Sequence, residues 1–289
     1  MSNSVLIIGC GDIGQRAAAL HLQHGERVSG MTRNQDRIAR LETLGIATLT
    51  GDLDNPRMLS ALPTGHALVY YFAPPPDAGN TDPRMVNFIS TLHPEQAPLK
   101  VIYLSTSGVY GDCLGAWVTE DTPPHPQTPR AQARLGAETA LREWSLHSGT
   151  PVVILRVGGI YGPGRLPIAR IREGLPVVRI EDCPYTNRIH ADDLARICVA
   201  AAERGKAGAI YNVCDGESST MTHYFNAVAD LLQLPRPPQI SMAEAQWKLS
   251  PGMLSYLNES RRMDNRRMIE ELGVTLRYPN LQAGLAASI

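Results

Sequence analysis

The sequence predicts an α/β fold in which helices cover both faces of a doubly wound parallel sheet. Short apolar segments of strand length alternate with helix-like segments through residues 5–104. The strand segments are nearly continuous apolar runs, which is typical of strands that are buried on both faces. With 289 residues, the chain is also long enough to enclose a large core.

Five strands and the helices between them are expected in this first part of the chain. The strands are expected at 5–8, within 25–33, and at 46–53, 67–72 and 100–104. The helices are expected at 15–22, after Arg33, after Asn55-Pro56 and at 84–92. A proline suits the first position of a helix, where its missing N–H leaves no hydrogen bond unmade.

The first strand leads directly into a glycine-rich turn. Gly9, Gly11 and Gly14 have the spacing G-x-G-x-x-G, between an apolar strand and a helical segment. In such a turn, the first glycine permits the bend, the second lets the backbone approach a pyrophosphate, and the third lets helix and strand pack closely. The free N–H groups of the helix then face the phosphates. A dinucleotide is therefore expected here, held by Gly9, Cys10, Gly11, Asp12, Ile13 and Gly14.

The end of the second strand bears on the choice of dinucleotide. NAD-preferring sites usually place an acidic residue there, whereas an arginine suits the 2′-phosphate of NADP. Here the strand ends in Thr32-Arg33, and the nearest acid, Glu26, precedes the strand. Arg33 therefore favours NADP over NAD. The alternative is a solvent-exposed arginine at the start of a basic helix.

Composition excludes several functional classes. The chain has 27 Lys and Arg against 28 Asp and Glu, so no strong field favours a nucleic acid or an anionic membrane. The first strand begins too early for a signal peptide, and no apolar run has membrane-spanning length. Five scattered cysteines without a C-x-x-C pair argue for reduced thiols in a cytoplasmic protein, and no metal motif is present.

The fifth strand ends in Ser105-Thr-Ser-Gly-Val-Tyr-Gly111. Together with the glycine turn, this segment resembles the short-chain dehydrogenase/reductase superfamily, in its extended branch of NAD-dependent epimerases and dehydratases. Further matches follow in the family's order at 52–53, 120–124, 155–164, 187–194, 210–213 and 260–273. The resemblance covers essentially the whole chain. It implies a Rossmann-type sheet, NAD or NADP as cofactor, and a small polar, nucleotide-sugar-like substrate.

The sequence departs from the family at its reactive pair. The family has Y-x-x-x-K, whose tyrosine transfers a proton and whose lysine binds the nicotinamide ribose. Counting from the proline-rich loop, these two positions hold Arg130 and Arg134. Neither guanidinium serves as a proton donor near neutral pH, because its pKa stays above about 12. The chain is therefore most similar to the atypical members that lack the pair.

The resemblance also suggests roles for individual residues. Thr106 would polarise the substrate oxygen, unless it only caps the strand end. Arg134 would replace lysine at the ribose, with Arg130 on the same helix face; the alternative is two solvated arginines. Glu138 is expected to pair with Arg134 at i,i+4, and His190 to fix a helix. The remaining candidates are Asp52 and Leu53 at the adenine, Phe72 and Ala73 at the cleft floor, and Ser107, Tyr110 and Tyr161 at the substrate. The alternative for the two tyrosines is a purely structural role.

Two parts of the chain are expected to have different tasks. Residues 1–163 would form the dinucleotide-binding core, and 164–289 a mixed part. Within this mixed part, 188–213 would return to the core, while 164–187 and 214–289 would form a substrate lobe. The sequence predicts an oxidoreductase or epimerase, or alternatively a sensor that binds NADP(H) with little or no catalysis. A homodimer is left open.

Overall fold

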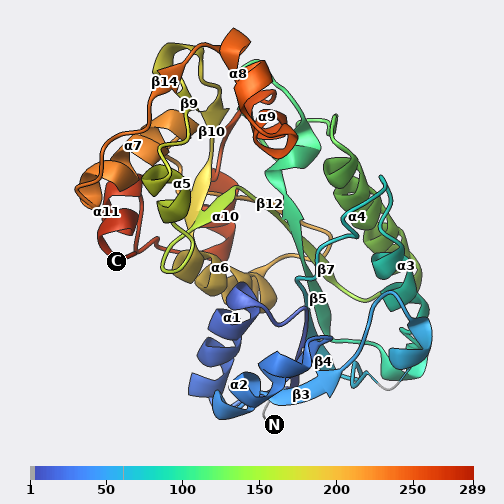
Figure 1. The fold of residues 1–289 in the computed structure, drawn as a ribbon. Helices are drawn as coiled ribbons and strands as arrows, with labels where there is room; N and C mark the ends of the chain where they lie inside the picture. Colours follow the sequence, from blue (N-terminus) through green and yellow to red (C-terminus); the bar gives the residue numbers. More distant parts are fainter. Residues whose placement is uncertain (1–3, 61) are drawn as a thin grey trace.

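The computed structural model describes residues 4–60 and 62–289. Its centre is a seven-stranded sheet in which every pair of neighbours is parallel (Figure 1). The strands, in spatial order, are β3 (Ala47–Thr50), β2 (Arg27–Thr32), β1 (Ser4–Ile8), β4 (Ala67–Tyr71), β5 (Lys100–Thr106), β7 (Val152–Val157) and β12 (Ile210–Val213). The strand order reverses between β1 and β4, where doubly wound sheets form their ligand crevice. The predicted fold class is confirmed.

Helices cover both faces of this sheet because its strands alternate their apolar side chains between two cores. Val5 and Ile7 of β1 belong to the core under α1 (Asp12–Gln23), α2 (Ile38–Thr43), α6 (Ala191–Arg204) and α10 (Arg266–Leu272). Leu6 and Ile8 belong to the opposite core, under α3 (Pro83–Ser90) and α4 (Pro129–Ser148). Figure 1 shows α3 and α4 together on one side of the sheet.

A second body, called here the upper lobe, is built mostly from the later part of the chain (Figure 1). Its helices are α5 (Ile168–Arg172), α7 (Met221–Leu231), α8 (Met242–Lys248), α9 (Pro251–Leu257) and α11 (Leu281–Ala286). Short strand pairs accompany them: β9 (Val177–Val178) with β14 (Gln239–Ile240), β10 (Tyr185–Thr186) with β13 (Ser219–Thr220), β11 (Arg188–His190) with β8 (Gly159–Tyr161), and β15 (Arg262–Met263) with β6 (Trp117–Val118). Apolar clusters separate from the sheet cores hold this lobe together.

Some expected boundaries differ from those observed. The third strand ends at Thr50, because Asp52 accepts the backbone N–H of Asp54 at 3.0 Å in a side-chain turn that leads the chain out of the sheet. The helix expected after Asn55 is a single 3₁₀ turn, Pro56–Met58. In the part of the chain that the structure describes, each helix is too short or too polar to cross a membrane.

Candidate functional site

The glycine turn after β1 has the close contacts and the open space that a dinucleotide requires. Gly9 has a φ of +84°, and a Cβ there would lie only 2.6 Å from the backbone nitrogen of Ala73. A Cβ on Gly14 would lie 3.1 Å from Ile7 Cγ2, so helix and strand pack tightly. Around Gly11, by contrast, the nearest such contact is 4.0 Å. The backbone at Gly11 is therefore open to a diphosphate.

Helix α1 begins directly behind this open space. Gly11 is its N-cap, and no side chain caps the helix, which leaves N–H groups of the first turn free for an anion. Asp12 is bound by Arg16 at 2.9 Å and by Arg165 at 2.5 Å. Partial burial favours a higher pKa for Asp12, but hydrogen bonds from Arg165 and Arg16 outweigh it and lower that pKa. The carboxylate next to the proposed phosphate site is thus neutralised by two arginines.

Cys10 contributes its backbone to the turn, and its side chain lies on the inner side. Its N–H donates to the carbonyl of Met31 at 3.2 Å, which joins the turn to the end of β2. Its sulfur lies so close to Gly30 that a Cβ on that glycine would approach it to 2.9 Å. Burial raises the pKa of Cys10 to about 11, so the thiol stays protonated. Ile13 is likewise buried, on the inner face of α1.

The residues expected at the adenosine end surround the ends of β2 and β3. Thr32 accepts the N–H of Asn34 at 3.1 Å through its hydroxyl, which fixes the turn that carries Arg33. Asp52 shapes the turn after β3, and Leu53 is buried. Arg33 is 64% exposed and lies 3.5 Å from a carboxylate oxygen of Asp54. Sequence reasoning missed Asp54, because nothing in a single sequence shows that the β3 loop reaches the end of β2.

The predicted floor of the cleft lies beside the glycine turn. Phe72 donates its N–H to the carbonyl of Ile8 at 2.8 Å, so the chain after β4 still follows β1. The next residue, Ala73, is the one that Gly9 approaches so closely. Both Phe72 and Ala73 are buried. This places the ends of β1 and β4 in direct contact at the point where the strand order reverses.

Arg134 reaches this same point from α4. Its Nη1 lies 3.3 Å from the carbonyl of Ala73, 2.9 Å from that of Leu104 and 3.2 Å from the hydroxyl of Tyr103. The side chain is buried, and three oxygens at the ends of β4 and β5 fix its position. Arg130, one turn earlier, is exposed. The two arginines that were expected to act together therefore have different surroundings.

The hydroxyl groups at the end of β5 also differ from one another. Thr106 accepts the N–H of Gly108 at 3.2 Å and caps the 3₁₀ turn Ser107–Tyr110. Ser105 is buried and donates to Glu138 at 2.5 Å. Thr106 and Ser107 are half-buried, so both remain accessible near the crevice. Capping does not occupy Thr106 completely, because a hydroxyl that accepts one hydrogen bond still has a proton to donate.

The two tyrosines expected at the substrate lie in the interior. Tyr110 donates to Asn212 at 2.7 Å, and the guanidinium of Arg156 lies 4.8 Å above its ring. Burial raises the pKa of Tyr110 to about 12. Tyr161 donates to the carbonyl of Asn280 at 3.4 Å. Both side chains are 1% exposed, which supports the structural alternative for these residues.

The expected pair between Glu138 and Arg134 is wrong. Glu138 instead binds Arg156 of β7, at 2.7 Å to Nη2 and at 3.2 Å to Nε. The inner face of α4 lies across several strands of the sheet, so residues one turn apart meet different partners. Arg134 meets the ends of β4 and β5, whereas Glu138 meets Ser105 of β5 and Arg156 of β7. The expected structural role of His190 is confirmed, because its Nδ1 accepts the N–H of Asp192 and caps α6.

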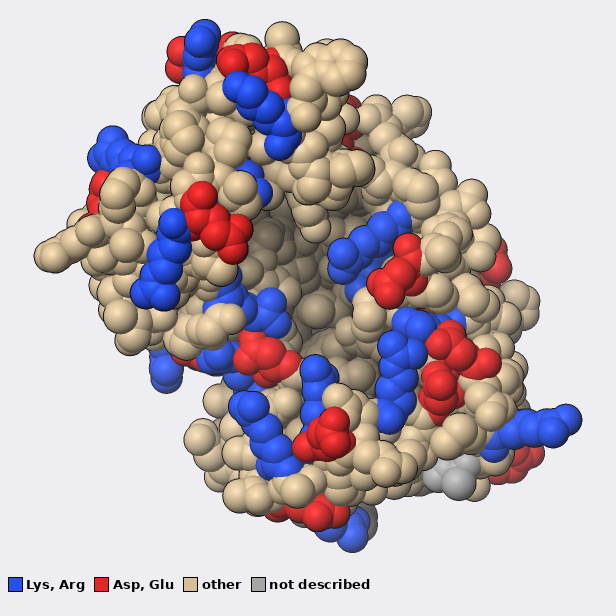
Figure 2. Space-filling view, in the orientation of Figure 1, with Lys and Arg blue, Asp and Glu red and all other residues tan. Residues whose placement is uncertain are grey.

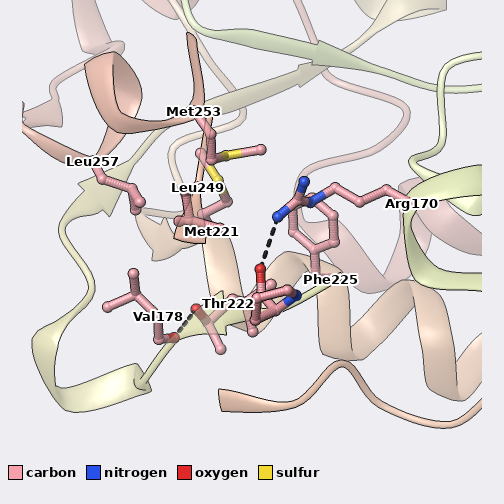
Figure 3. A pocket seen from close by; sticks show the side chains of 10 residues that line it. Arg170, Val178, Met221, Thr222, Phe225, Leu249, Met253 and Leu257 are labelled. Carbon is pink, nitrogen blue, oxygen red and sulfur yellow. Dashed lines mark hydrogen bonds between the residues drawn. The ribbon is translucent and has the colours of Figure 1, made fainter. Parts of the chain in front are cut away.

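The upper lobe contains a small apolar cavity near Arg170 and Phe225 (Figure 3). Its other labelled lining residues are Val178, Met221, Thr222, Leu249, Met253 and Leu257. The cavity holds about 10 Å³, which is about the space of one water molecule, so it does not accommodate a substrate. Figure 2 shows a wider hollow between the sheet and the upper lobe, with Lys and Arg side chains around it.

Comparison with known proteins agrees with this geometry. The sequence model of the NAD dependent epimerase/dehydratase family matches residues 5–214. Protein YeeZ of Escherichia coli (strain K12) is 29% identical, and the alignment covers 96% of each chain. GDP-6-deoxy-D-mannose reductase of Pseudomonas aeruginosa is also 29% identical, but the alignment spans only 52% of this chain and 56% of that protein.

Two solved structures are similar over nearly the whole length. A functionally unknown conserved protein from Silicibacter pomeroyi has a TM-score of 0.84 and 30% identity, covering 99% of this chain and 98% of its own. MoeE5, solved in complex with UDP-glucose and NAD, has a TM-score of 0.77 and 22% identity, and it covers 99% and 97%. The second likeness concerns the fold alone. With the family match over most of the chain, these findings show that the protein belongs to the NAD dependent epimerase/dehydratase family.

Proposed function

We propose that the protein uses NADP, or NAD, as an oxidoreductase or epimerase/dehydratase acting on a small polar, nucleotide-sugar-like substrate. The observation that carries the proposal is the convergence of Gly9, Ala73 and Arg134 where β1 and β4 end. The open backbone at Gly11 and the uncapped start of α1 suit the diphosphate of a dinucleotide. The substrate class is supported by GDP-6-deoxy-D-mannose reductase, a relative in sequence, and by MoeE5, which was solved in complex with UDP-glucose and NAD.

Each proposed role follows from the position of a side chain. A bound dinucleotide supplies a nicotinamide ring that exchanges a hydride with a carbon atom of the substrate. Arg134 would hold the nicotinamide ribose and stabilise negative charge on the reacting oxygen. A guanidinium has five N–H donors, and among the described residues only Nη1 contacts protein oxygens. Thr106 would donate its free hydroxyl proton to that oxygen, and Ser107 would contact the substrate beside it.

The proton that such a reaction transfers needs another source. Arginines stand at both positions of the family's reactive pair, and a guanidinium does not act as a proton donor in general acid catalysis. Tyr110 and Tyr161 are buried, and burial raises the pKa of each phenol. In our proposal, water or a group of the substrate therefore supplies or accepts the proton.

The same observations motivate a second candidate function. A protein that binds NADP(H) but transfers hydride slowly or not at all would act as a redox-state sensor. It would retain the glycine turn and dispense with the Tyr-Lys pair, as this sequence does at Arg130 and Arg134.

One experiment separates these functions. Purified protein is titrated with NADPH and with NADH by calorimetry, and then assayed for turnover with carbonyl compounds and nucleotide sugars. Binding followed by turnover supports the enzyme. Binding without turnover on any of these substrates supports the sensor, and absence of binding to either dinucleotide overturns both.

A variant of Thr106 tests the catalytic step. Thr106→Ala is expected to reduce turnover by about 100-fold, because a positioned hydroxyl that stabilises a developing oxyanion contributes on that scale. Thr106→Ser should retain most of the activity. The matched control is Thr139→Ala on the exposed face of α4, which should leave turnover unchanged. An unchanged rate in Thr106→Ala would show that this hydroxyl does not act on the substrate.

A further inference from the structure

Three charged side chains, two from loops and one from the start of a helix, meet beside the dinucleotide turn. Arg33 follows β2, Asp54 lies in the loop after β3, and Arg84 lies in the first turn of α3. Arg84 binds both carboxylate oxygens of Asp54, with Nε and Nη2 each at 2.7 Å. Arg33 approaches the same carboxylate to 3.5 Å. We call Arg33, Asp54 and Arg84 the arginine–aspartate cluster.

The two arginines of this cluster are held differently. Arg84 also donates through Nη1 to the carbonyl of Pro74 at 3.1 Å, and its side chain is only 13% exposed. Three hydrogen bonds, two to Asp54 and one to Pro74, fix this planar guanidinium in one orientation. Arg33 is 64% exposed and has one long contact, so little free energy opposes its movement. Arg84 is thus the fixed member and Arg33 the mobile one.

The cluster lies on the adenosine side of the proposed dinucleotide site. The backbone of Cys10 binds the carbonyl of Met31, which places the glycine turn directly beside the end of β2. Asn87 of α3 donates to the carbonyl of Leu53 at 2.8 Å, which ties the β3 loop to the helix that carries Arg84. The ends of β2 and β3 are where doubly wound folds distinguish the 2′-hydroxyl of NAD from the 2′-phosphate of NADP.

We propose that Arg84 and Arg33 together bind the 2′-phosphate of NADP, and that Asp54 is the counter-ion which this phosphate displaces from them. The proposal rests on the proposed function, because it assumes that a dinucleotide binds at the glycine turn. A phosphate monoester carries three acceptor oxygens and a charge of about −1.5 to −2 near neutral pH. Two guanidiniums match that charge, and arginine forks bind phosphate oxygens in pairs.

In this proposal, the carboxylate of Asp54 and the 2′-phosphate compete for the same two arginines. Hydrogen bonds from Arg84 lower the pKa of Asp54, so its carboxylate is ionised at neutral pH and competes with an incoming phosphate. The same carboxylate could accept a hydrogen bond from the 2′-hydroxyl of NAD. Removing only its charge should therefore strengthen binding of the phosphorylated ligand and leave the unphosphorylated ligand unimproved.

The test compares two small ligands that differ by the phosphate alone, adenosine 2′,5′-bisphosphate and adenosine 5′-monophosphate. Dissociation constants are measured by calorimetry for the full chain, and NADPH and NADH are measured in parallel. Asp54→Asn is expected to tighten binding of the bisphosphate by about tenfold, while Arg84→Gln should weaken it by about tenfold or more. Both variants should change binding of the monophosphate by less than about twofold.

Arg37→Gln is the matched control, because this arginine is exposed in the same β2–α2 connection but does not belong to the cluster. It should leave both dissociation constants unchanged. Thermal melting of every variant checks that the fold is retained, and if Arg84→Gln fails to fold, Asp54→Asn carries the test alone. The inference is overturned if the ratio of the two dissociation constants is unchanged in both variants, or if Asp54→Asn tightens binding of both ligands. Either result leaves the proposed dinucleotide site intact. A wild-type protein that binds neither NADPH nor NADH would instead overturn the proposed function.

Discussion

The buried ion pair between Glu138 and Arg156 allows a quantitative prediction. The two side chains are 2% and 3% exposed, and Nη1 of Arg156 is buried without a hydrogen-bond partner among the described residues. Glu138→Gln removes the charge that compensates this guanidinium and keeps the size of the side chain. Breaking a buried pair in this way costs about 3–5 kcal/mol. The free energy of unfolding of a typical domain is only about 5–15 kcal/mol, so the variant should be severely destabilised.

The expected loss corresponds to a decrease in Tm on the order of 10 °C, at about 2–4 °C per kcal/mol. The measurement is urea unfolding followed by circular dichroism, with the same m-value required for each variant. A double variant, Glu138→Leu with Arg156→Met, should recover most of the lost stability, because apolar residues of similar volume often replace a buried pair without cost.

The exposed pair between Glu203 and Arg204 provides the control, since Glu203→Gln should change stability by no more than about 1 kcal/mol. A loss below about 1 kcal/mol in Glu138→Gln would refute the reasoning. A double variant that is as unstable as Glu138→Gln alone would refute it as well. A large loss also matters for function, because Glu138 anchors the helix that carries Arg134.

Three further predictions each concern a single residue. Gly9→Ala should weaken NADPH binding by at least about tenfold and lower the Tm, because its Cβ would lie 2.6 Å from the backbone of Ala73 at a φ of +84°. Calorimetry and melting curves measure the two effects. A variant with wild-type affinity would argue against a cofactor at this turn. Burial raises the pKa of Asp215 from 3.8 to about 7. Between pH 4 and 7 the unfolded chain has therefore released this proton while the native state still holds it, so the free energy of unfolding falls by up to about 4 kcal/mol over this range. Asp215→Asn should therefore match the wild type at pH 4 and be more stable at pH 8 in urea titrations, and parallel pH profiles would contradict the assignment. Tyr110→Phe should lower the free energy of unfolding by about 1–3 kcal/mol, because it leaves Asn212 without its hydrogen-bond donor, and turnover should be preserved. Lost turnover at unchanged stability would instead give Tyr110 a catalytic role.

The sequence was informative where structure depends on neighbours along the chain. The turn from Gly9 to Gly14 requires particular backbone conformations and close approaches within a few residues, so its glycines revealed it. The alternation of buried strands and helices predicted the doubly wound sheet for the same reason, because each apolar run specifies its own burial. The cap that His190 provides is local too, since it binds the N–H of a residue only two positions later.

The tertiary structure decided every feature that depends on residues far apart in the sequence. Arg130 and Arg134 have the same chemistry and share a helix face, yet only packing shows that one is exposed and the other is fixed under the glycine turn.

For the same reason, the sequence did not show which residues the charged side chains pair with. Glu138 was expected to bind its neighbour on the helix and instead binds Arg156, because the strand β7 buried beneath the helix places that guanidinium next to it. The carboxylate beside Arg33 comes from Asp54, in the loop after β3. The sequence by itself thus determined the fold and predicted where a dinucleotide would bind. Only the tertiary structure decided which charges surround that position, because electrostatic partners are set by distance in space and not by distance along the chain.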